Sequence, residues 1–148
     1  MRIIQVEERD KRGYMDLLLL ADEQENMIEK YLYRGEMFAL YDDDLRAIAV
    51  VTDEGGGDFE IKNIATVPAY QRMGYGKALI EHIVRQHRES GRTLYVGTGD
   101  SPLTLGFYGR CGFVHSHTVK NFFVDNYDRP IVEDGKQLVD MIYLKREL

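Results

Sequence analysis

Two glycines separated by one residue stand just before a helical pattern, in the segment Gln71 to Gly76, and Lys77 follows them directly. The N–H groups that open a helix have no partner within the helix, and the helix dipole places partial positive charge beside them. Glycines let such groups approach an anion closely, and the side chains of Arg72 and Lys77 would add full charges. The segment therefore predicts a site for a phosphate or diphosphate group.

Two well-known phosphate-binding patterns do not fit this segment. A P-loop would need a glycine where Gln71 stands and a serine or threonine in place of Ala78. A dinucleotide fingerprint would need a third glycine in place of Leu79 and an acidic residue near positions 95–97, which hold Tyr, Val and Gly. For the two glycines alone, a helix start that binds no ligand stays open as an alternative.

A second motif lies downstream, where a helical segment ends in a glycine turn and a strand follows. It covers Phe107 to Phe113 and reads Phe-Tyr-Gly-Arg-Cys-Gly-Phe. Taken in order with Val67, Pro68 and the segment Gln71 to Gly76, it resembles the GCN5-related N-acetyltransferase (GNAT) family. In that family the first motif holds the diphosphate of coenzyme A, and the tyrosine of the second closes the thioester end. The element order is similar over nearly the whole chain.

The resemblance implies that acetyl coenzyme A is the cosubstrate and that it adds to an open sheet edge between strands 59–67 and 93–96. Backbone groups would pair with its pantetheine arm, and the helix start would bind its diphosphate. Ser101 stands where many relatives carry an asparagine, and a serine can still donate a hydrogen bond or cap the helix. The implied cofactor-binding residues are Ala65, Thr66, Val67, Gln71, Arg72, Met73, Gly74, Tyr75, Gly76, Lys77, Ser101 and Tyr108.

The resemblance also implies two catalytic residues. An alkylamine, with a pKa of about 10.4, must lose a proton before it attacks a thioester. Glu60 occupies the position of the glutamate base in the histone-acetylating branch of the family, and Tyr108 would protonate the departing thiolate or orient the thioester. An exposed strand-end acid and a packed helix-end tyrosine are the structural alternatives. Direct transfer needs no covalent intermediate, so Cys111 is expected to be a small buried core residue.

Apolar patterning predicts the elements that position these residues within one mixed α/β domain over residues 1–148. The resemblance implies a mostly antiparallel central sheet, splayed in the middle, with flanking helices. The acidic run Asp42 to Asp44 is expected to be a solvated hairpin turn. Residues 13–35 and 125–136 are expected to shape the pocket for the acceptor amine. Strands are predicted at residues 1–7, 37–41, 47–52, 59–67, 93–96, 112–124 and 137–145, and helices at 13–21, 24–33, 74–90 and 101–110.

Composition excludes several kinds of partner. The 148 residues carry a formal net charge of −6 without a basic cluster, which argues against nucleic acid and is more compatible with a cationic small molecule or peptide. The apolar runs are too short to span a bilayer and the N-terminus lacks a signal pattern, so a cytoplasmic protein with no membrane partner is expected. The long C-terminal strands would allow a homodimer.

No metal site is predicted. His115 and His117 alternate along a predicted strand and are expected to share one face, but no third ligand stands at a suitable spacing. They could instead line the substrate pocket.

Three functions remain compatible with the sequence. The first is an N-acetyltransferase that acts on a primary amine of a small molecule or peptide. The second is a non-catalytic sensor or regulatory module that binds acyl coenzyme A, and the third is a plain nucleotide-phosphate binder.

Overall fold

A computed structural model describes residues 1–148 and contains a seven-stranded sheet in the order β1-β2-β3-β4-β5-β9-β6. Only the β4–β5 pair is parallel, and every other neighbouring pair is antiparallel. The predicted mostly antiparallel sheet is thus confirmed. The strands are β1 (Arg2–Val6), β2 (Glu36–Asp42), β3 (Asp44–Gly55), β4 (Asp58–Thr66), β5 (Thr93–Thr98), β6 (Val114–Val119) and β9 (Met141–Glu147), and a separate ribbon pairs β7 (Val132–Glu133) with β8 (Lys136–Gln137).

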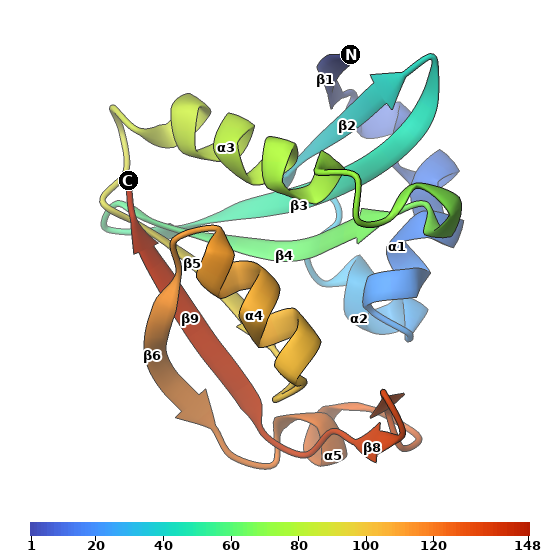
Figure 1. Ribbon diagram of the computed structural model, residues 1–148, viewed down its shortest axis with the longest axis vertical. Coiled ribbons are helices and arrows are strands. Elements are labelled where there is room, and N and C mark those ends of the chain that lie inside the picture. The colour runs from blue at the N-terminus through green and yellow to red at the C-terminus, as the bar shows by residue number, and fades with distance from the viewer.

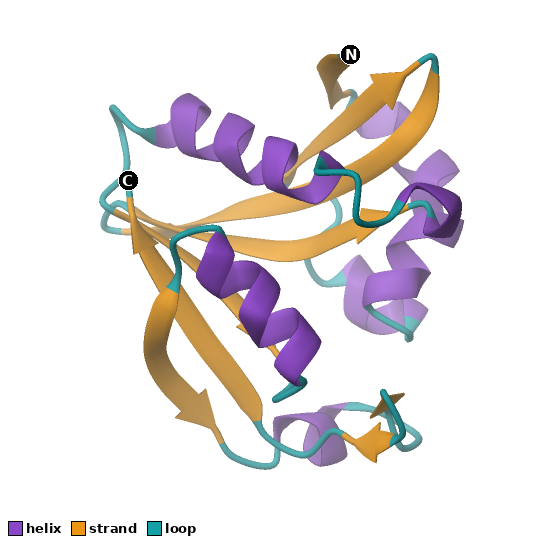
Figure 2. Cartoon of the chain, viewed as in Figure 1, coloured by secondary structure: helices purple, strands orange, loops and turns teal.

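Helices cover both faces of the sheet (Figure 1, Figure 2). On one face lie α3 (Tyr75–His87) and α4 (Pro102–Arg110), and on the other lie α1 (Met15–Ala21) and α2 (Glu25–Glu29). Two 3-10 helices, η1 (Glu8–Tyr14) and η2 (Pro68–Tyr70), and the short α5 (Phe122–Asn126) complete the chain. None of the helices combines the length and the apolar character that crossing a membrane requires.

The central strand β3 explains why two cores form. Ala47, Ala49 and Val51 pack toward α3, while Ile48 and Val50 pack toward α1 and α2. Because successive side chains of a strand point to opposite faces, a strand buried on both sides needs a continuous apolar run. The predicted stripe on the long helix faces this sheet as expected: Leu79, Ile80, Ile83 and Val84 are all buried.

The C-terminal third departs from the sequence prediction. The strand predicted over residues 112–124 ends at Val119, because Asn121 adopts a left-handed φ of 58° and opens α5. The predicted loop 125–136 contains part of α5 and the β7–β8 ribbon. The last strand begins at Met141 rather than at residue 137, because Leu138 packs into a small third core with Phe123 and Ile131.

The prediction that His115 and His117 share a face is wrong. A bulge in β6 lies between them, so that His115 is opposite Leu144 and His117 is opposite Tyr143. Because Leu144 and Tyr143 are consecutive in β9, the two histidines point to opposite faces of the sheet. The ring of His117 stacks on that of Tyr143 with centroids 4.7 Å apart. The free edges of the sheet are β1 and β6, and β9 is an interior strand.

Candidate active site

A cleft opens where β4 and β5 separate. The two strands pair only from Asp58 to Ile61, and beyond that point β4 continues beside β3 alone (Figure 1). A cavity of about 1220 Å³ occupies the opening and is lined by β4, β5, α3, α4 and the loops at their ends. The backbone groups on this edge of β4 have no neighbouring strand, which is the arrangement that accepts an extended ligand.

The start of α3 forms one end of this cleft. Arg72 and Gly74 have left-handed φ angles of 64° and 89°, and no side chain caps the helix. A Cβ on Gly74 would meet nothing within 4 Å, so glycine is required there by the backbone conformation and not by crowding. The first N–H groups of α3 therefore remain open to an anion, with Arg72 and Lys77 beside them in the cleft wall.

The two sequence motifs meet at Gly76. A Cβ on this residue would lie 3.2 Å from Cζ of Phe107 on α4, closer than most side chains tolerate. Glycine thus lets the start of α3 approach α4, which carries Tyr108 one residue further along. The close contact of two helices fixes the anion-binding end of the cleft relative to this tyrosine.

Most of the predicted cofactor residues line the cleft, and three do not. Met73 is 62% exposed, and the N–H of Val67 donates to the carbonyl of Arg46 at 2.8 Å. Ser101 is buried and its hydroxyl donates to Asp134 at 2.9 Å. The residues in the wall are Ala65, Thr66, Gln71, Arg72, Gly74, Tyr75, Gly76, Lys77 and Tyr108.

Tyr75 has a structural partner outside the cleft. Its hydroxyl donates to Asp42 Oδ2 at 2.9 Å, and Arg46 lies over the ring of Tyr70 at 3.5 Å. The acidic run that begins at Asp42 is a hairpin turn, as predicted, with a left-handed φ of 65° at Asp43. Asp42 is not merely solvated, because it ties this turn to the first turn of α3.

Tyr108 is 6% exposed and belongs to the cleft wall, with Phe107 and Phe113 packed edge-on against its ring. Burial, with smaller contributions from Cys111 and Glu133, raises the pKa of its hydroxyl above the usual range. The phenol is therefore protonated at neutral pH and can donate a proton or a hydrogen bond. Cys111 is buried as predicted, and burial likewise raises the pKa of its thiol, which opposes a nucleophilic role.

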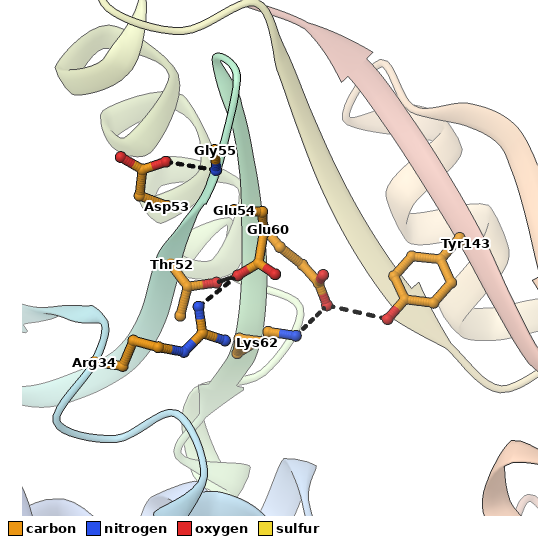
Figure 3. Close-up of polar contacts among 8 residues, drawn as sticks. All are labelled: Arg34, Thr52, Asp53, Glu54, Gly55, Glu60, Lys62 and Tyr143. Carbon is orange, nitrogen blue, oxygen red and sulfur yellow. Dashed lines mark hydrogen bonds and ion pairs between the residues drawn. The ribbon is translucent and has the colours of Figure 1, made fainter.

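Glu60 lies beside the cleft rather than in its wall. Figure 3 shows its carboxylate between Lys62 and Tyr143: Lys62 Nζ is 3.0 Å from Oε2, and the hydroxyl of Tyr143 donates to the same oxygen at 3.3 Å. The side chain of Glu60 is only 12% exposed. Glu60 is opposite Thr52 in the β3–β4 ladder, on the same face of the sheet as Glu54. Glu54 in turn accepts hydrogen bonds from Thr52 and Arg34.

Of the further polar residues in the cleft wall that the sequence reasoning did not single out, Asp22, Asn63 and Tyr127 belong to one hydrogen-bonded network. The Nδ2 group of Asn63 donates to the carbonyl of Leu18 and to the hydroxyl of Tyr31, both at 3.0 Å. Asp22 accepts hydrogen bonds from Tyr31 at 2.9 Å and from Tyr127 at 2.5 Å. Burial raises the pKa of Asp22, against the opposing effect of these two hydrogen bonds.

One of these residues carried a readable signal. Phe59, Ile61, Asn63 and Ala65 are the buried alternate positions of β4, and Asn63 is the one polar residue among them, only 4% exposed. A polar residue at an inward position of a strand must find partners, and so it marks a polar contact inside the fold. Asp22 and Tyr127 carry no such signal, because a helix end and a loop normally hold polar residues.

The segments predicted to shape the acceptor pocket do line the cleft. Residues 20–23 come from the end of α1 and its connection to α2, and residues from 123 to 138 come from the segment between β6 and β9. Tyr127 and Asp128 join the two segments, since the N–H of Asp128 also donates to the side chain of Gln24 at 2.9 Å. No group of three or more His, Cys, Asp or Glu side chains is arranged to hold a metal ion.

Several known proteins are similar to this chain over nearly its whole length. The N-acetyltransferase YvbK of Bacillus subtilis strain 168, itself described as uncharacterized, is 35% identical over 100% of this chain and 97% of its own. The structure of a GNAT family acetyltransferase from Elizabethkingia anophelis with acetyl-CoA bound has a TM-score of 0.92 and 35% identity, covering 99% of this chain and 97% of that one. The IAA acetyltransferase from Bacillus cereus ATCC 14579 has a TM-score of 0.92 and 31% identity, covering 99% of both chains.

The family model of the acetyltransferase (GNAT) domain matches residues 33–115. This range runs from just before β2 through α3 and α4 into the start of β6, and it contains both sequence motifs. Together with full-length relatives above 30% identity, the match confirms the family that the motifs indicated. The chain belongs to the GNAT acetyltransferase family.

Proposed function

We propose that the protein transfers the acetyl group of acetyl coenzyme A to a primary amine of a small molecule or peptide by direct attack. The observation that carries this proposal is the cleft at the β4–β5 separation, which joins an uncapped helix start to a buried tyrosine. The Elizabethkingia structure holds acetyl-CoA, and its fold matches 99% of this chain, which supports the same cosubstrate here.

The cofactor would lie along the cleft from α3 to Tyr108. Its diphosphate would accept hydrogen bonds from the first N–H groups of α3 and face Arg72 and Lys77. Its pantetheine arm would pair with the open edge of β4 near Ala65 and Thr66. Met73, Val67 and Ser101 lie outside the cleft wall, so we expect them to make no direct contact with the cofactor.

The transfer itself moves one acyl group and two protons. The neutral amine nitrogen attacks the thioester carbon, a carbon–nitrogen bond forms, and the carbon–sulfur bond breaks as the tetrahedral intermediate collapses. The leaving thiolate takes the phenolic proton of Tyr108, the nitrogen gives up its proton to a base, and the base returns a proton to the phenolate through solvent, so that amide and free thiol are the only products. Glu60 is the proposed base and would act through a water molecule, because its carboxylate is beside the cleft.

An amine panel with detection of free thiol tests the proposal. Mixing the protein, acetyl coenzyme A and a suitable amine should release coenzyme A in proportion to the acetylated amine found by mass spectrometry. The protein adds little background, because its one thiol, Cys111, is buried. Calorimetric binding of acetyl coenzyme A without turnover on the whole panel would indicate a regulatory module. Tighter binding of ATP or NAD than of coenzyme A would indicate a nucleotide binder.

A further inference from the structure

The positively and negatively charged side chains of the cleft lie at opposite ends of it. The basic ones are at the start of α3 and the end of α4, and the acidic ones are at the opposite end. A ligand that fills the cleft would meet positive charge beside its diphosphate and negative charge near the acceptor pocket. The basic side chains are Arg72, Lys77 and Arg110, and the acidic ones are Asp22, Glu23, Glu133 and Asp134.

Among the acidic residues, Asp22 is a half-buried carboxylate whose hydrogen-bond donors, Tyr31 and Tyr127, are both uncharged. Glu133 accepts a hydrogen bond from Thr104 and Asp134 accepts one from Ser101, both at the start of α4, where the helix dipole favours negative charge. Asp22 follows the last residue of α1, where the dipole has the opposite sign. None of the four acidic residues of the cleft takes part in an ion pair, and Asp22 combines this with partial burial. A half-buried carboxylate that is not in direct contact with a cation is costly, and a cationic ligand would relieve that cost.

An acceptor atom without a partner belongs to Asn63, which is linked to Asp22 through the hydroxyl of Tyr31. Asn63 Oδ1 is the one buried side-chain polar atom that finds no hydrogen-bond partner. The orientation of this amide is fixed by the two acceptors that its nitrogen contacts, the carbonyl of Leu18 and the hydroxyl of Tyr31. Tyr31 in turn donates to Asp22, so both acceptors belong to one network in the cleft wall. What this wall lacks is a hydrogen-bond donor with positive charge.

We propose that Asp22, linked to Asn63 through Tyr31, binds an ammonium group of the acceptor, and that the favoured acceptors are aliphatic compounds with at least two amino groups. This inference rests on the proposed amine acetylation. A carboxylate stabilises the protonated form of the amine it binds, which opposes the deprotonation that attack on the thioester requires. The amine held by Asp22 is therefore not the one that reacts, and a second amine on the same molecule must reach the thioester.

The test compares α,ω-diaminoalkanes with monoaminoalkanes of equal chain length, in steady-state assays of the wild-type protein and of Asp22→Asn. The wild-type protein should use diamines with a KM at least about tenfold lower than that of the matched monoamines. Asp22→Asn should remove this preference by raising the diamine KM at least about tenfold, while the monoamine KM and the acetyl coenzyme A KM stay within about twofold. Equal use of both series by the wild-type protein would overturn the inference. A loss of kcat at unchanged KM would do so too, because Asp22 would then act in the chemistry.

Glu23→Gln is the matched control, since Glu23 adjoins Asp22 and lines the cleft but is exposed. It should change the diamine KM less than about threefold, as expected for a screened surface charge. A comparable effect of Glu23→Gln would show that only the overall negative charge matters, against the inference. Thermal melting of each variant separates misfolding from a lost contact.

Two further measurements test the role of Asp22 even if no amine is acetylated, or if Asp22→Asn does not fold. If no amine is acetylated, the proposed function fails, but calorimetry of a diamine with the coenzyme A complex still tests Asp22: binding to the wild-type complex and not to the Asp22→Asn complex supports the inference, and no binding to either contradicts it. The second measurement uses Tyr127→Phe, which keeps the carboxylate of Asp22 and removes one of its two hydrogen-bond donors.

Tyr127→Phe should therefore raise the pKa of Asp22 further, because the hydrogen bond from Tyr127 lowers it. The groups that act on Asp22 are Tyr31, Tyr127, Lys30 and the neighbouring Glu23. As the pH falls, the carboxylate protonates and the diamine KM rises. In Tyr127→Phe this rise should begin at a higher pH than in the wild-type protein, and unchanged pH profiles would contradict the inference.

Discussion

Tyr108 lies in the cleft wall, and burial keeps its hydroxyl protonated, so that the hydroxyl is available to donate a hydrogen bond or a proton to the leaving group. Tyr108→Phe should lower kcat at least about tenfold with little change in the acetyl coenzyme A KM, because it removes a proton and leaves the ring. Steady-state assays measure this, with the exposed Tyr33→Phe as control. Since the pKa is raised, the wild-type kcat should not fall through loss of this proton between pH 7 and about pH 10. An unchanged kcat in Tyr108→Phe would place the tyrosine outside the chemistry.

Glu60 poses a different question, because the structure pairs it with Lys62 and Tyr143. If it accepts the proton of the amine, Glu60→Gln should lower kcat about a hundredfold or more, the usual effect of losing a general base. Glu54→Gln is the control, since Glu54 is on the same face of the sheet and also accepts hydrogen bonds, from Thr52 and Arg34 (Figure 3). Similar kcat values for both variants would mean that Glu60 only anchors Lys62.

At the scale of elements, the turn into α3 depends on a backbone conformation that an L-residue adopts with strain. Gly74→Ala should cost about 1–2 kcal/mol in that conformation, which would move the N–H groups of the helix start and weaken coenzyme A binding about tenfold. Titration calorimetry with coenzyme A measures the effect. Gly13→Ala is the control, because Gly13 has neither a positive φ nor a neighbour within 4 Å of an added Cβ. Unchanged affinity in Gly74→Ala would remove this turn from the cofactor site.

The helical N-terminal segment depends on a buried lysine. Lys11 is 1% exposed and its Nζ donates to the carbonyls of Leu32 and Gly35 at 2.9 and 2.6 Å, and to Glu8. Lys11→Met should lower the free energy of unfolding by about 2–4 kcal/mol, because both carbonyls lose a charged donor. Urea denaturation measures this loss. Arg9→Met, on the same 3-10 helix but exposed, should change stability by less than about 0.5 kcal/mol, and equal effects of the two changes would contradict the role of Lys11.

The sequence predicted the elements whose signals are local. The start of α3 follows from its glycines, and the buried face of α3 follows from the spacing of Leu79, Ile80 and Ile83. The segment after β6 was predicted poorly, because its structure depends on contacts between distant residues, such as Asn121 with Asp140. The same division applies to the site. The cofactor end is made by short contiguous motifs, whereas the acceptor end needs Asp22 and Tyr127 to meet across the fold.

At the scale of the whole molecule, the sheet consists of two parts that share one short parallel ladder. Strands β1 to β4 form an antiparallel meander, and β9 pairs with both β5 and β6 to form the second part. The ladder from Asp58 to Ile61 is the only strand pairing between the two parts, and the cleft begins where it stops. A ligand in the cleft would contact both parts at once.

This short ladder has a consequence for local unfolding. Without a ligand, the open edge of β4 should exchange its amide hydrogens by small openings of the two parts relative to each other, at a free energy below that of global unfolding. Coenzyme A should slow exchange in β4 beyond Ile61 and in β5 by pairing with one part and packing on the other. Hydrogen exchange followed by mass spectrometry would show this, with the β1–β2 pair as an unaffected reference. Uniform slowing across the sheet would instead mean that the two parts already open as one unit.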